Sequence, residues 1–243
     1  MIPLRTTSPT QQVPWVNYAL IGANVAVFVH ELSLEAQLEP FIQAYGWIPE
    51  KFFRAVQQGG VPPLLALLVS MFLHGSWLHL LGNLLYLYIF GGNVEDRLGH
   101  LRYVVFYCVG GIVATLVQTY ATQWSSSPMI GASGAIAAVA GAYVVFFPTA
   151  RVWTLIPLVI SFRVVRVPAV VYLFLWLVVQ GIAAFYLVSL DHPGQGEVAW
   201  WAHAGGFVAG LTLGPLFLLR SRRSKRARIH SQIVFDLPRS AWR

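Results

Sequence analysis

The sequence predicts an all-α membrane protein, a bundle of six transmembrane helices with a short central fourth helix. Hydrophobic residues make up 57% of the 243 residues, and charged residues make up only 10%. Soluble domains contain about 25% charged residues, so this composition excludes an ordinary soluble protein. Several uncharged apolar runs approach the roughly 20 residues that a helix needs to cross a bilayer. We therefore expect one multi-pass domain embedded in a membrane.

The apolar runs define the expected spans and their order. They are residues 13–29, 76–93, 101–120, 131–147, 169–188 and 200–219. No small-residue cleavage site follows the first run, and further spans do, so that run is interpreted as a helix rather than a signal peptide. The chain then divides into an N-terminal cytoplasmic segment at 1–12, the six-helix domain at 13–219 and a basic tail at 220–243.

Two further apolar pieces are too short to cross about 30 Å of hydrocarbon. Residues 62–73 belong to the long connection 30–77, which we expect to be partly helical and to lie in the membrane interface. Residues 152–160 lie between the fourth and fifth spans and are flanked by arginines. Neither piece is counted as a span.

The positions of lysine and arginine predict that both termini lie in the cytoplasm. In that orientation only Lys51 and Arg54 lie outside, whereas the opposite orientation would export the basic cluster that begins at Arg220. The positive-inside rule therefore favours cytoplasmic termini, and we expect a bacterial plasma membrane. The expected partners of the basic tail are membrane lipids, whose headgroups it would anchor, and not nucleic acid.

Four polar side chains inside the spans provide the functional signal, because such groups are unfavourable in a membrane and tend to be functional. His79 and Asn83 are four residues apart in the second span and so share one helical face. Ser133 opens the fourth span, and His203 lies near the start of the sixth. These three spans run in the same direction, so the four side chains are expected at one depth, roughly 5–10 Å below the outer surface.

Ser133 stands at the start of a run of small residues. Gly131 frees the backbone beside it, while Gly134, Ala138 and Gly141 would allow a neighbouring helix to approach closely. A helix that begins here would also direct unpaired N–H groups toward the serine. The alternative interpretation is a packing helix whose serine bonds its own backbone.

The combination of polar groups fits acyl transfer by an activated serine. A neutral imidazole at His203 can take the hydroxyl proton of Ser133 and return it to the leaving amine. Asn83, His79 and the N–H groups at the start of the fourth span can stabilise the negative charge that develops on the carbonyl oxygen. No carboxylate lies within the predicted spans, so a Ser–His dyad is expected in place of a Ser–His–Asp triad.

Three motifs carry a resemblance to a known family. They are His79-Leu80-Leu81-Gly82-Asn83, Gly131-Ala132-Ser133-Gly134 and His203-Ala204-Gly205-Gly206. With these motifs the chain resembles the rhomboid-family intramembrane serine proteases over essentially its whole length. The resemblance implies that Ser133 is the nucleophile and that His203 is the general base and acid. It also implies an oxyanion hole formed by His79, Asn83 and the backbone N–H of Ser133, and single-span transmembrane proteins as substrates.

Two positions depart from the pattern of the family. Some members carry a tyrosine that packs against the catalytic imidazole, and Ala137 occupies that position here. A Trp-Arg pair of the first loop is replaced by Phe53-Arg54. The sequence therefore does not specify what orients His203 or what anchors the first loop.

Hydrolysis requires water at Ser133, which lipid cannot supply. We expect a water-filled cavity open to the outer face, bounded by the second, fourth and sixth spans and covered by the loop 191–197. Phe174 and Trp176 in the fifth span are expected to be packing or lipid-facing residues, or parts of a lateral gate. If they form a gate, Trp176→Ala should raise the cleavage of a transmembrane substrate.

Two other functions remain open. One is a catalytically inactive rhomboid-like protein that binds transmembrane helices, and the other is a small transporter. A transporter is disfavoured because the polar groups lie off-centre and no internal repeat is evident. His74 is expected to form a hydrogen bond within the first loop rather than to act chemically. A metal site built from His74, His79 and His203 would lack a Cys or carboxylate ligand, so no metal or cofactor is expected.

Overall fold

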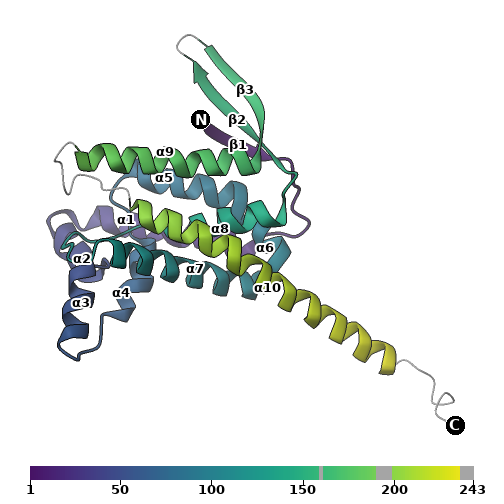
Figure 1. Cartoon of the computed structure of the whole chain (residues 1–243), viewed down its shortest axis with the longest axis horizontal. Coiled ribbons are helices and arrows are strands. Elements are labelled where there is room, and N and C mark those ends of the chain that lie inside the picture. Colours follow the sequence, from purple (N-terminus) through teal and green to yellow (C-terminus); the bar gives the residue numbers. More distant parts are fainter. Residues whose placement is uncertain (159–160, 190–198, 236–243) are drawn as a thin grey trace.

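The computed structural model describes residues 1–158, 161–189 and 199–235, and it is mostly helical (Figure 1). Its helices are α1 (Trp15–Ser33), α2 (Leu38–Tyr45), α3 (Pro49–Gln57), α4 (Leu64–Val69), α5 (Trp77–Tyr86), α6 (Gly92–Leu98), α7 (His100–Ala121), α8 (Ser133–Phe146), α9 (Ala169–Ser189) and α10 (Trp200–Phe235). Short 3₁₀ or π turns join some of them: η1 (Glu35–Gln37), η2 (Ser70–Phe72) and η3 (Leu87–Gly91). The strands are β1 (Ile2–Thr6), β2 (Arg151–Leu158) and β3 (Ser161–Pro168). The long first connection is partly helical, as predicted.

Three helices in the described part of the chain are individually long and apolar enough to cross a membrane. They are α7, α9 and the apolar portion of α10, Trp200–Leu219. Two bent pairs raise the number to five if each pair is one span: Trp15–Ser33 with Glu35–Tyr45, and Leu64–Phe72 with Trp77–Leu98. The chain is therefore an integral membrane protein, but the predicted count of six spans is not confirmed.

α8 is shorter than a typical membrane span. It has 14 residues, which at 1.5 Å per residue is a length of roughly 21 Å. The hydrocarbon layer is about 30 Å thick, so α8 cannot cross it alone. Nearly all of its side chains are buried, as expected for a short helix at the centre of the bundle.

Several helices extend beyond the predicted spans. α1 ends at Ser33 rather than at residue 29, and α5, η3 and α6 together continue to Leu98. This extension includes Glu31 and Glu95, each of which is only 1% exposed. The predicted spans themselves contain no carboxylate, but the helices continue beyond them and bury these two carboxylates just past the ends of the apolar runs. The basic tail also begins inside a helix, since α10 continues to Phe235.

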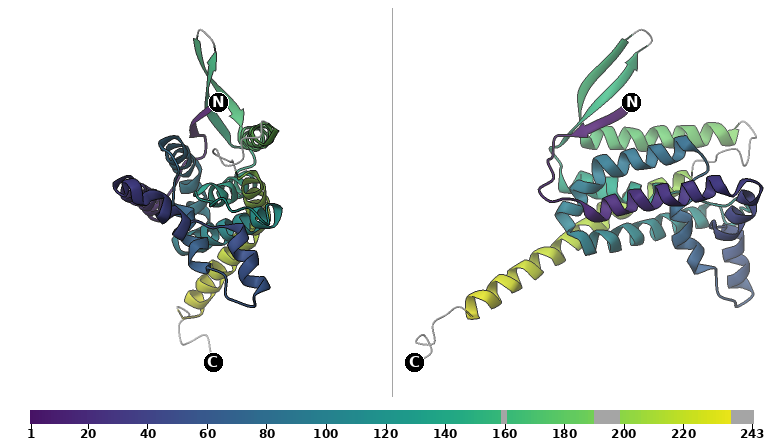
Figure 2. Two further views of the ribbon diagram at one scale, coloured as in Figure 1. Left: turned by 90° about the vertical axis from the view of Figure 1, so that its left-hand side faces the viewer. Right: turned by 180° about the vertical axis from the view of Figure 1, so that it is seen from behind.

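The described chain also contains a sheet, so the all-α prediction is wrong. β1, β2 and β3 form a three-stranded antiparallel sheet in that order. β2 covers most of the apolar piece that is too short to span, and β3 follows it. The valines of the two strands favour extended backbone. These are Val152, Val164, Val165 and Val167. Figure 2 shows the hairpin of β2 and β3 projecting away from the helices in both views.

The backbones of α8 and α10 are in direct contact. A Cβ added at Gly206 would overlap the carbonyl oxygen of Gly134, and one added at Gly210 would overlap that of Ala138. The reverse contact is equally close, because a Cβ at Gly141 would overlap a backbone carbonyl of α10. The close helix approach predicted for the small residues of α8 is therefore confirmed, and it follows the small-residue packing common in membrane helices.

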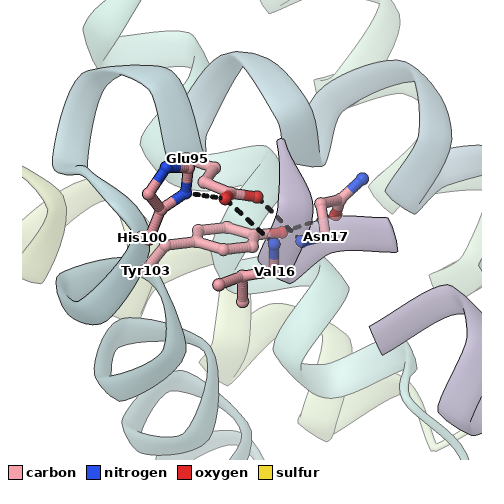
Figure 3. A network of polar contacts seen from close by, with 5 residues as sticks. All are labelled: Val16, Asn17, Glu95, His100 and Tyr103. Atoms are coloured by element: carbon pink, nitrogen blue, oxygen red, sulfur yellow. Dashed lines mark hydrogen bonds and ion pairs between the residues drawn. The ribbon is translucent and has the colours of Figure 1, made fainter. Parts of the chain in front are cut away.

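Glu95 of α6 binds the start of α1 (Figure 3). The first turn of α1 has no side-chain cap at its own N-cap residue, so its N–H groups need another acceptor. Glu95 supplies it: the N–H of Val16 donates to Oε1 at 3.1 Å, and the N–H of Asn17 donates to Oε2 at 2.8 Å. His100 Nδ1 bonds to the same carboxylate. A carboxylate is favourable at the positive end of a helix, so Glu95 holds α1 in place.

Removing the Glu95 carboxylate is expected to destabilise the fold. Glu95→Ala would leave two N–H groups of α1 without their acceptor, and each hydrogen bond to a charged group contributes about 1.5–3 kcal/mol. We expect the free energy of unfolding in detergent to fall by about 3–5 kcal/mol. The matched control is Asp96→Ala, because Asp96 accepts an exposed bond from the N–H of Gln11 and should change stability by less than about 1 kcal/mol. Equal losses in the two variants would contradict the role of Glu95.

Candidate active site

The start of α5 positions His79 and Asn83. Ser76 is the N-cap of this helix, and its hydroxyl accepts a hydrogen bond from the N–H of His79 at 3.2 Å. The cap fixes the first turn, with His79 in that turn and Asn83 one turn later. Both side chains face the loop that precedes α8, because a Cβ on Gly131 would lie 2.6 Å from His79 Nε2 and 3.8 Å from Asn83 Nδ2. The two residues share one face of the helix, as predicted.

Gly131 can only be glycine. Its φ is +122°, a conformation that side chains of L residues rarely adopt. A side chain at this position would also strike the ring of His79. The N–H of Gly131 donates to the carbonyl oxygen of Ser70 at 2.8 Å, which ties the loop to η2. The backbone freedom predicted for Gly131 is therefore confirmed, and it brings the start of α8 against α5.

Ser133 is the first residue of α8 and is half-buried. The residue before it gives α8 no side-chain cap, so the first N–H groups of the helix are available to a ligand atom near the serine. A cavity of about 20 Å³ adjoins Ser133, and its lining includes Thr115, Met129 and Ala202. This volume is sufficient for about one water molecule. The cavity is lined from η2, α7, α8 and the start of α10, so the predicted boundary on the second span is not observed for it.

His203 lies in the first turn of α10 and is 6% exposed. Gln118 of α7 fixes this turn, because its Oε1 accepts a hydrogen bond from the N–H of Ala202 at 3.1 Å. Ala202 faces the start of α8, where a Cβ on Gly134 would lie 3.8 Å from the Cβ of Ala202. In Figure 1 the helices α5, α8 and α10 run in the same direction and begin at the same end of the bundle. The structure therefore brings the helix starts that carry the four predicted site residues together.

The indole ring of Trp176 packs on the imidazole of His203. Their ring centres are 5.4 Å apart, and the ring planes are inclined by 36°. The Nδ1 atom of His203 has no hydrogen-bond partner among the residues that the structure describes. Trp176 also packs on Tyr86 of α5, with ring centres 5.3 Å apart. An aromatic ring thus reaches the imidazole from α9, whereas α8 carries only Ala137 at the position where some relatives have tyrosine.

His74 contacts the site through Asn83. Its Nδ1 donates to the carbonyl oxygen of Phe72 at 3.1 Å, so its Nε2 can accept a hydrogen bond from Asn83 Nδ2 at 2.9 Å. The backbone N–H of His74 donates to the carboxylate of Glu31 at 3.1 Å. The predicted hydrogen bond within the first loop is confirmed, but the link to Asn83 was missed. The signal available in the sequence was the short spacing between His74 and the start of the second span.

The first loop is anchored by Trp47 rather than by a Trp-Arg pair. Trp47 is fully buried, and its indole N–H donates to the hydroxyl of Thr119 at 2.7 Å. Its backbone pairs with Met129 in both directions, at 3.1 Å and 2.7 Å. Met129 lies just before the loop that carries Gly131, so the first loop and the start of α8 are held together. The sequence, with Phe53-Arg54 in place of the Trp-Arg pair, did not specify what anchors the first loop. The structure shows that Trp47 anchors it.

Two expectations concern features that the structure describes only in part. The loop 191–197, expected to cover the site, lies outside the described residues. In the described part of the chain, no group of three or more His, Cys, Asp or Glu side chains is arranged to hold a metal ion.

Comparison with known proteins identifies the family. Residues 63–220 match the family model described as the Rhomboid domain. RHOMBOID-like protein 5 of Arabidopsis thaliana is 29% identical over 154 residues, which cover 63% of this chain and 44% of that protein. Rhomboid protein 1, mitochondrial, of Saccharomyces cerevisiae is 27% identical over 207 residues, which cover 81% and 51%. Rhomboid-type serine protease 2 of Emericella nidulans is 31% identical over 163 residues, which cover 67% and 28%.

The chain spans about half or less of the length of these relatives. They do not support the expected bacterial plasma membrane, because the yeast relative is a mitochondrial protein by name. The matched segment contains His79, Asn83, Ser133 and His203. The Rhomboid domain model matches more than half of the residues of this chain, so the chain belongs to the rhomboid family.

Proposed function

We propose that the chain is an intramembrane serine endopeptidase that hydrolyses peptide bonds in or near the transmembrane helices of single-span membrane proteins. The observation that carries the proposal is the convergence of the starts of α5, α8 and α10, which carry an alcohol, two imidazoles and an amide. A relative named as a serine protease adds support. The alternative is an inactive rhomboid-like protein that binds transmembrane helices, and it is disfavoured because Ser133 and His203 are both present.

In the proposed reaction Ser133 is the nucleophile and His203 is the base. Ser133 Oγ attacks the carbonyl carbon of the scissile bond while the imidazole of His203 takes the hydroxyl proton. The C–N bond then breaks, and the imidazolium gives its proton to the leaving amine, so that an acyl-enzyme forms. A water molecule, deprotonated by His203, hydrolyses the ester, and the proton returns to Ser133 Oγ.

Three donors are proposed to stabilise the oxyanion: the ring of His79, the amide of Asn83 and the backbone N–H of Ser133. Asn83 supports this role because one of its amide hydrogens is held by Nε2 of His74 at 2.9 Å. Its other amide hydrogen is then available for the substrate oxygen. Donors that are fixed in advance need no rearrangement during the reaction, which is the main source of their catalytic effect.

The proposed topology has six spans with both termini in the cytoplasm. The spans are α1, the continuous segment from α5 through α6, then α7, the short α8 together with the residues that flank it, α9 and α10. A substrate helix hides its carbonyl groups in i→i−4 hydrogen bonds, so it must enter from the side and unwind near Ser133. We therefore expect cleavage to be favoured by glycine, alanine or serine near the outer end of the substrate helix.

Labelling with a fluorophosphonate probe tests the proposed function. Purified full-length protein in detergent would be incubated with the probe, digested and analysed by mass spectrometry. We expect Ser133 to be modified and no other serine, because only a serine next to a base is activated. Heat-denatured protein should not react. Labelling of a different serine would contradict the assignment, and folded protein that binds a transmembrane peptide without reacting would favour the inactive alternative.

The contact between Trp176 and His203 changes what we expect of Trp176→Ala. A stacked aromatic pair contributes about 0.5–1.5 kcal/mol, so loss of the ring is expected to lower kcat by up to about tenfold. Trp176→Phe should retain most of the activity because it keeps an aromatic face. The measurement is kcat and KM for a transmembrane substrate in detergent.

Phe174→Ala is the matched control for this experiment. Phe174 lies on the same helix, and its side chain is 61% exposed. Its removal should leave kcat unchanged, since it lies on the exposed side of α9. A rise in cleavage for both variants would support the gate and contradict the positioning role of Trp176.

A further inference from the structure

The three-stranded sheet has no part in the proposed reaction. It leaves the bundle at the end where α9 begins and where α10 continues past the other helices (Figure 1). β2 and β3 pair along their whole length, from Arg151 opposite Pro168 to Leu158 opposite Ser161. Eight residues per strand make a hairpin roughly 26 Å long. It extends sideways from the helices rather than along them (Figure 2).

The pairing register assigns side chains to the two faces of the sheet, because residues directly opposite each other share a face. On the first face Trp153 lies opposite Arg166 and Arg5, and Leu155 lies opposite Val164 and Ile2. On the second face Val152 and Thr154 are fully buried at the base of the sheet. The second face is therefore used for packing at its base, and the first face is left uncovered.

The uncovered face combines arginine, tryptophan and aliphatic residues. The guanidinium groups of Arg5 and Arg166 stack on the ring of Trp153, at 4.9 Å and 4.2 Å from its centre. Farther along the hairpin Phe162 is 73% exposed and Val164 is 49% exposed. Apolar side chains this open to water on a projecting hairpin indicate a surface that is covered by another phase or molecule.

The charge of the sheet indicates what covers it. The segments 1–14 and 147–168 contain Arg5, Arg151, Arg163 and Arg166, and they contain no Asp or Glu. The basic run from Arg220 onward lies in α10, which extends from the same end of the bundle. Basic side chains bind anionic headgroups, while Trp and apolar side chains settle at the boundary with the acyl chains. A membrane surface satisfies both requirements at once.

We propose that the sheet is a lateral membrane anchor, which lies against the anionic headgroups of the adjacent leaflet and inserts Phe162 at their boundary with the acyl chains. The anchor is connected directly to the fifth span, because β3 ends at Pro168 and α9 begins at Ala169. It also touches α9 farther on, since the hydroxyl of Tyr172 donates to the carbonyl oxygen of Met1 at 3.4 Å. The proposal does not depend on proteolytic activity.

Site-directed spin labelling of the full-length protein tests the anchor. The labelled position is Phe162→Cys in a Cys108→Ser background, reconstituted in nanodiscs of phosphatidylcholine with or without phosphatidylglycerol. We expect the label to collide more often with oxygen, which concentrates in the acyl region, than with a water-soluble nickel complex. The preference for oxygen should be larger with phosphatidylglycerol. A label at Gln12, an exposed polar position before α1, is the matched control and should favour the nickel complex.

Replacing Arg5 and Arg166, the two arginines that stack on Trp153 on the uncovered face, together with glutamine should remove the effect of phosphatidylglycerol. A second label at Val164→Cys separates a local disturbance at Phe162 from a failure of the anchor. Labels at both positions that favour the nickel complex in both lipids would overturn the proposal and indicate a face for a soluble partner. Immersion that is independent of lipid charge would overturn the recognition of anionic headgroups.

Discussion

Replacing Ser133 with alanine is expected to reduce cleavage of a transmembrane substrate by at least about 10⁴-fold, because the attacking oxygen is lost. Ser133 begins α8, and the uncapped N-terminus of that helix directs its N–H groups toward the same position. In the Ser133→Ala variant, no other nucleophile at this position can replace the Oγ atom of Ser133. The measurement is the rate of product formation in proteoliposomes that contain purified enzyme and a single-span substrate.

Binding of the substrate provides the control for the Ser133 experiment. Ser133→Ala removes one oxygen atom from a half-buried residue, so the fold and the affinity for the substrate helix should persist. Ser33→Ala is the matched variant, because the hydroxyl of Ser33 donates to the carbonyl oxygen of His30 within its own helix, and Ser33 does not line the cavity beside Ser133. Its activity should stay near that of the wild type. Cleavage by Ser133→Ala within tenfold of the wild-type rate would show that Ser133 is not the nucleophile.

His203→Asn is the second change expected to have a large effect. General acid–base catalysis contributes about 10²–10⁴-fold, and asparagine cannot take up the serine proton at neutral pH. The loss should appear in kcat rather than in KM, because His203 would act on the proton and not hold the substrate helix. Fluorophosphonate labelling of Ser133 should slow by a similar factor, since the probe reacts with the activated oxygen.

The same substitution at His30 is a matched control. His30 is an exposed histidine near the end of α1, and its ring packs against Phe41 of the first loop. His30→Asn should retain activity within a few-fold. If His203→Asn retains activity while His30→Asn loses it, the assignment of the base is wrong.

Helices bounded by charged or polar residues were the easiest part of the fold to predict. α7 and α9 each begin and end within one residue of the predicted spans, because an uncharged apolar run of about 20 residues is long enough to cross the bilayer as a helix. The ends of α1 and α6 were less predictable, because Glu31 and Glu95 lie just beyond the apolar runs and the sequence alone suggests that such charges are exposed to solvent. Their burial depends on partners in other parts of the chain: the N–H of His74 in the first loop for Glu31, and the N–H groups at the start of α1 for Glu95. Sequence periodicity carries no record of such contacts.

The sheet was missed for a related reason. Residues 152–160 are apolar but too short to cross the bilayer, so the sequence alone indicated no clear role for them. One partner strand, β1, lies about 150 residues earlier, at Ile2–Thr6. β2 is the central strand of the sheet, and it pairs both with β3, which follows it directly, and with β1. The hairpin of β2 and β3 is local in sequence, whereas the pairing with β1 is not. Long-range pairing of this kind cannot be read from a single stretch of sequence.

The candidate site divides in the same way. Ser133, His203, His79 and Asn83 could be named in advance because polar residues are rare inside apolar runs. The contacts that support them could not, because each comes from a different element: Trp176 from α9, Gln118 from α7 and His74 from the first loop. Residues of these types commonly serve in helix packing in membrane proteins, and only the folded structure shows that these three lie beside the site.

The glycine contacts between α8 and α10 make these two helices a rigid pair, whereas α9 can move independently of them. Backbones that touch without intervening side chains cannot slide or repack, so Ser133 and His203 should move as one rigid body. α9 is held less firmly, since 17% of its apolar window is buried compared with 39% for α7 and α10. Its amide hydrogens should therefore exchange with deuterium faster than those of α8. Because Trp176 belongs to α9, any movement of α9 away from the bundle would also withdraw the indole from His203. The molecule would then alternate between a receptive state and a reactive state, and cleavage would wait for α9 to return.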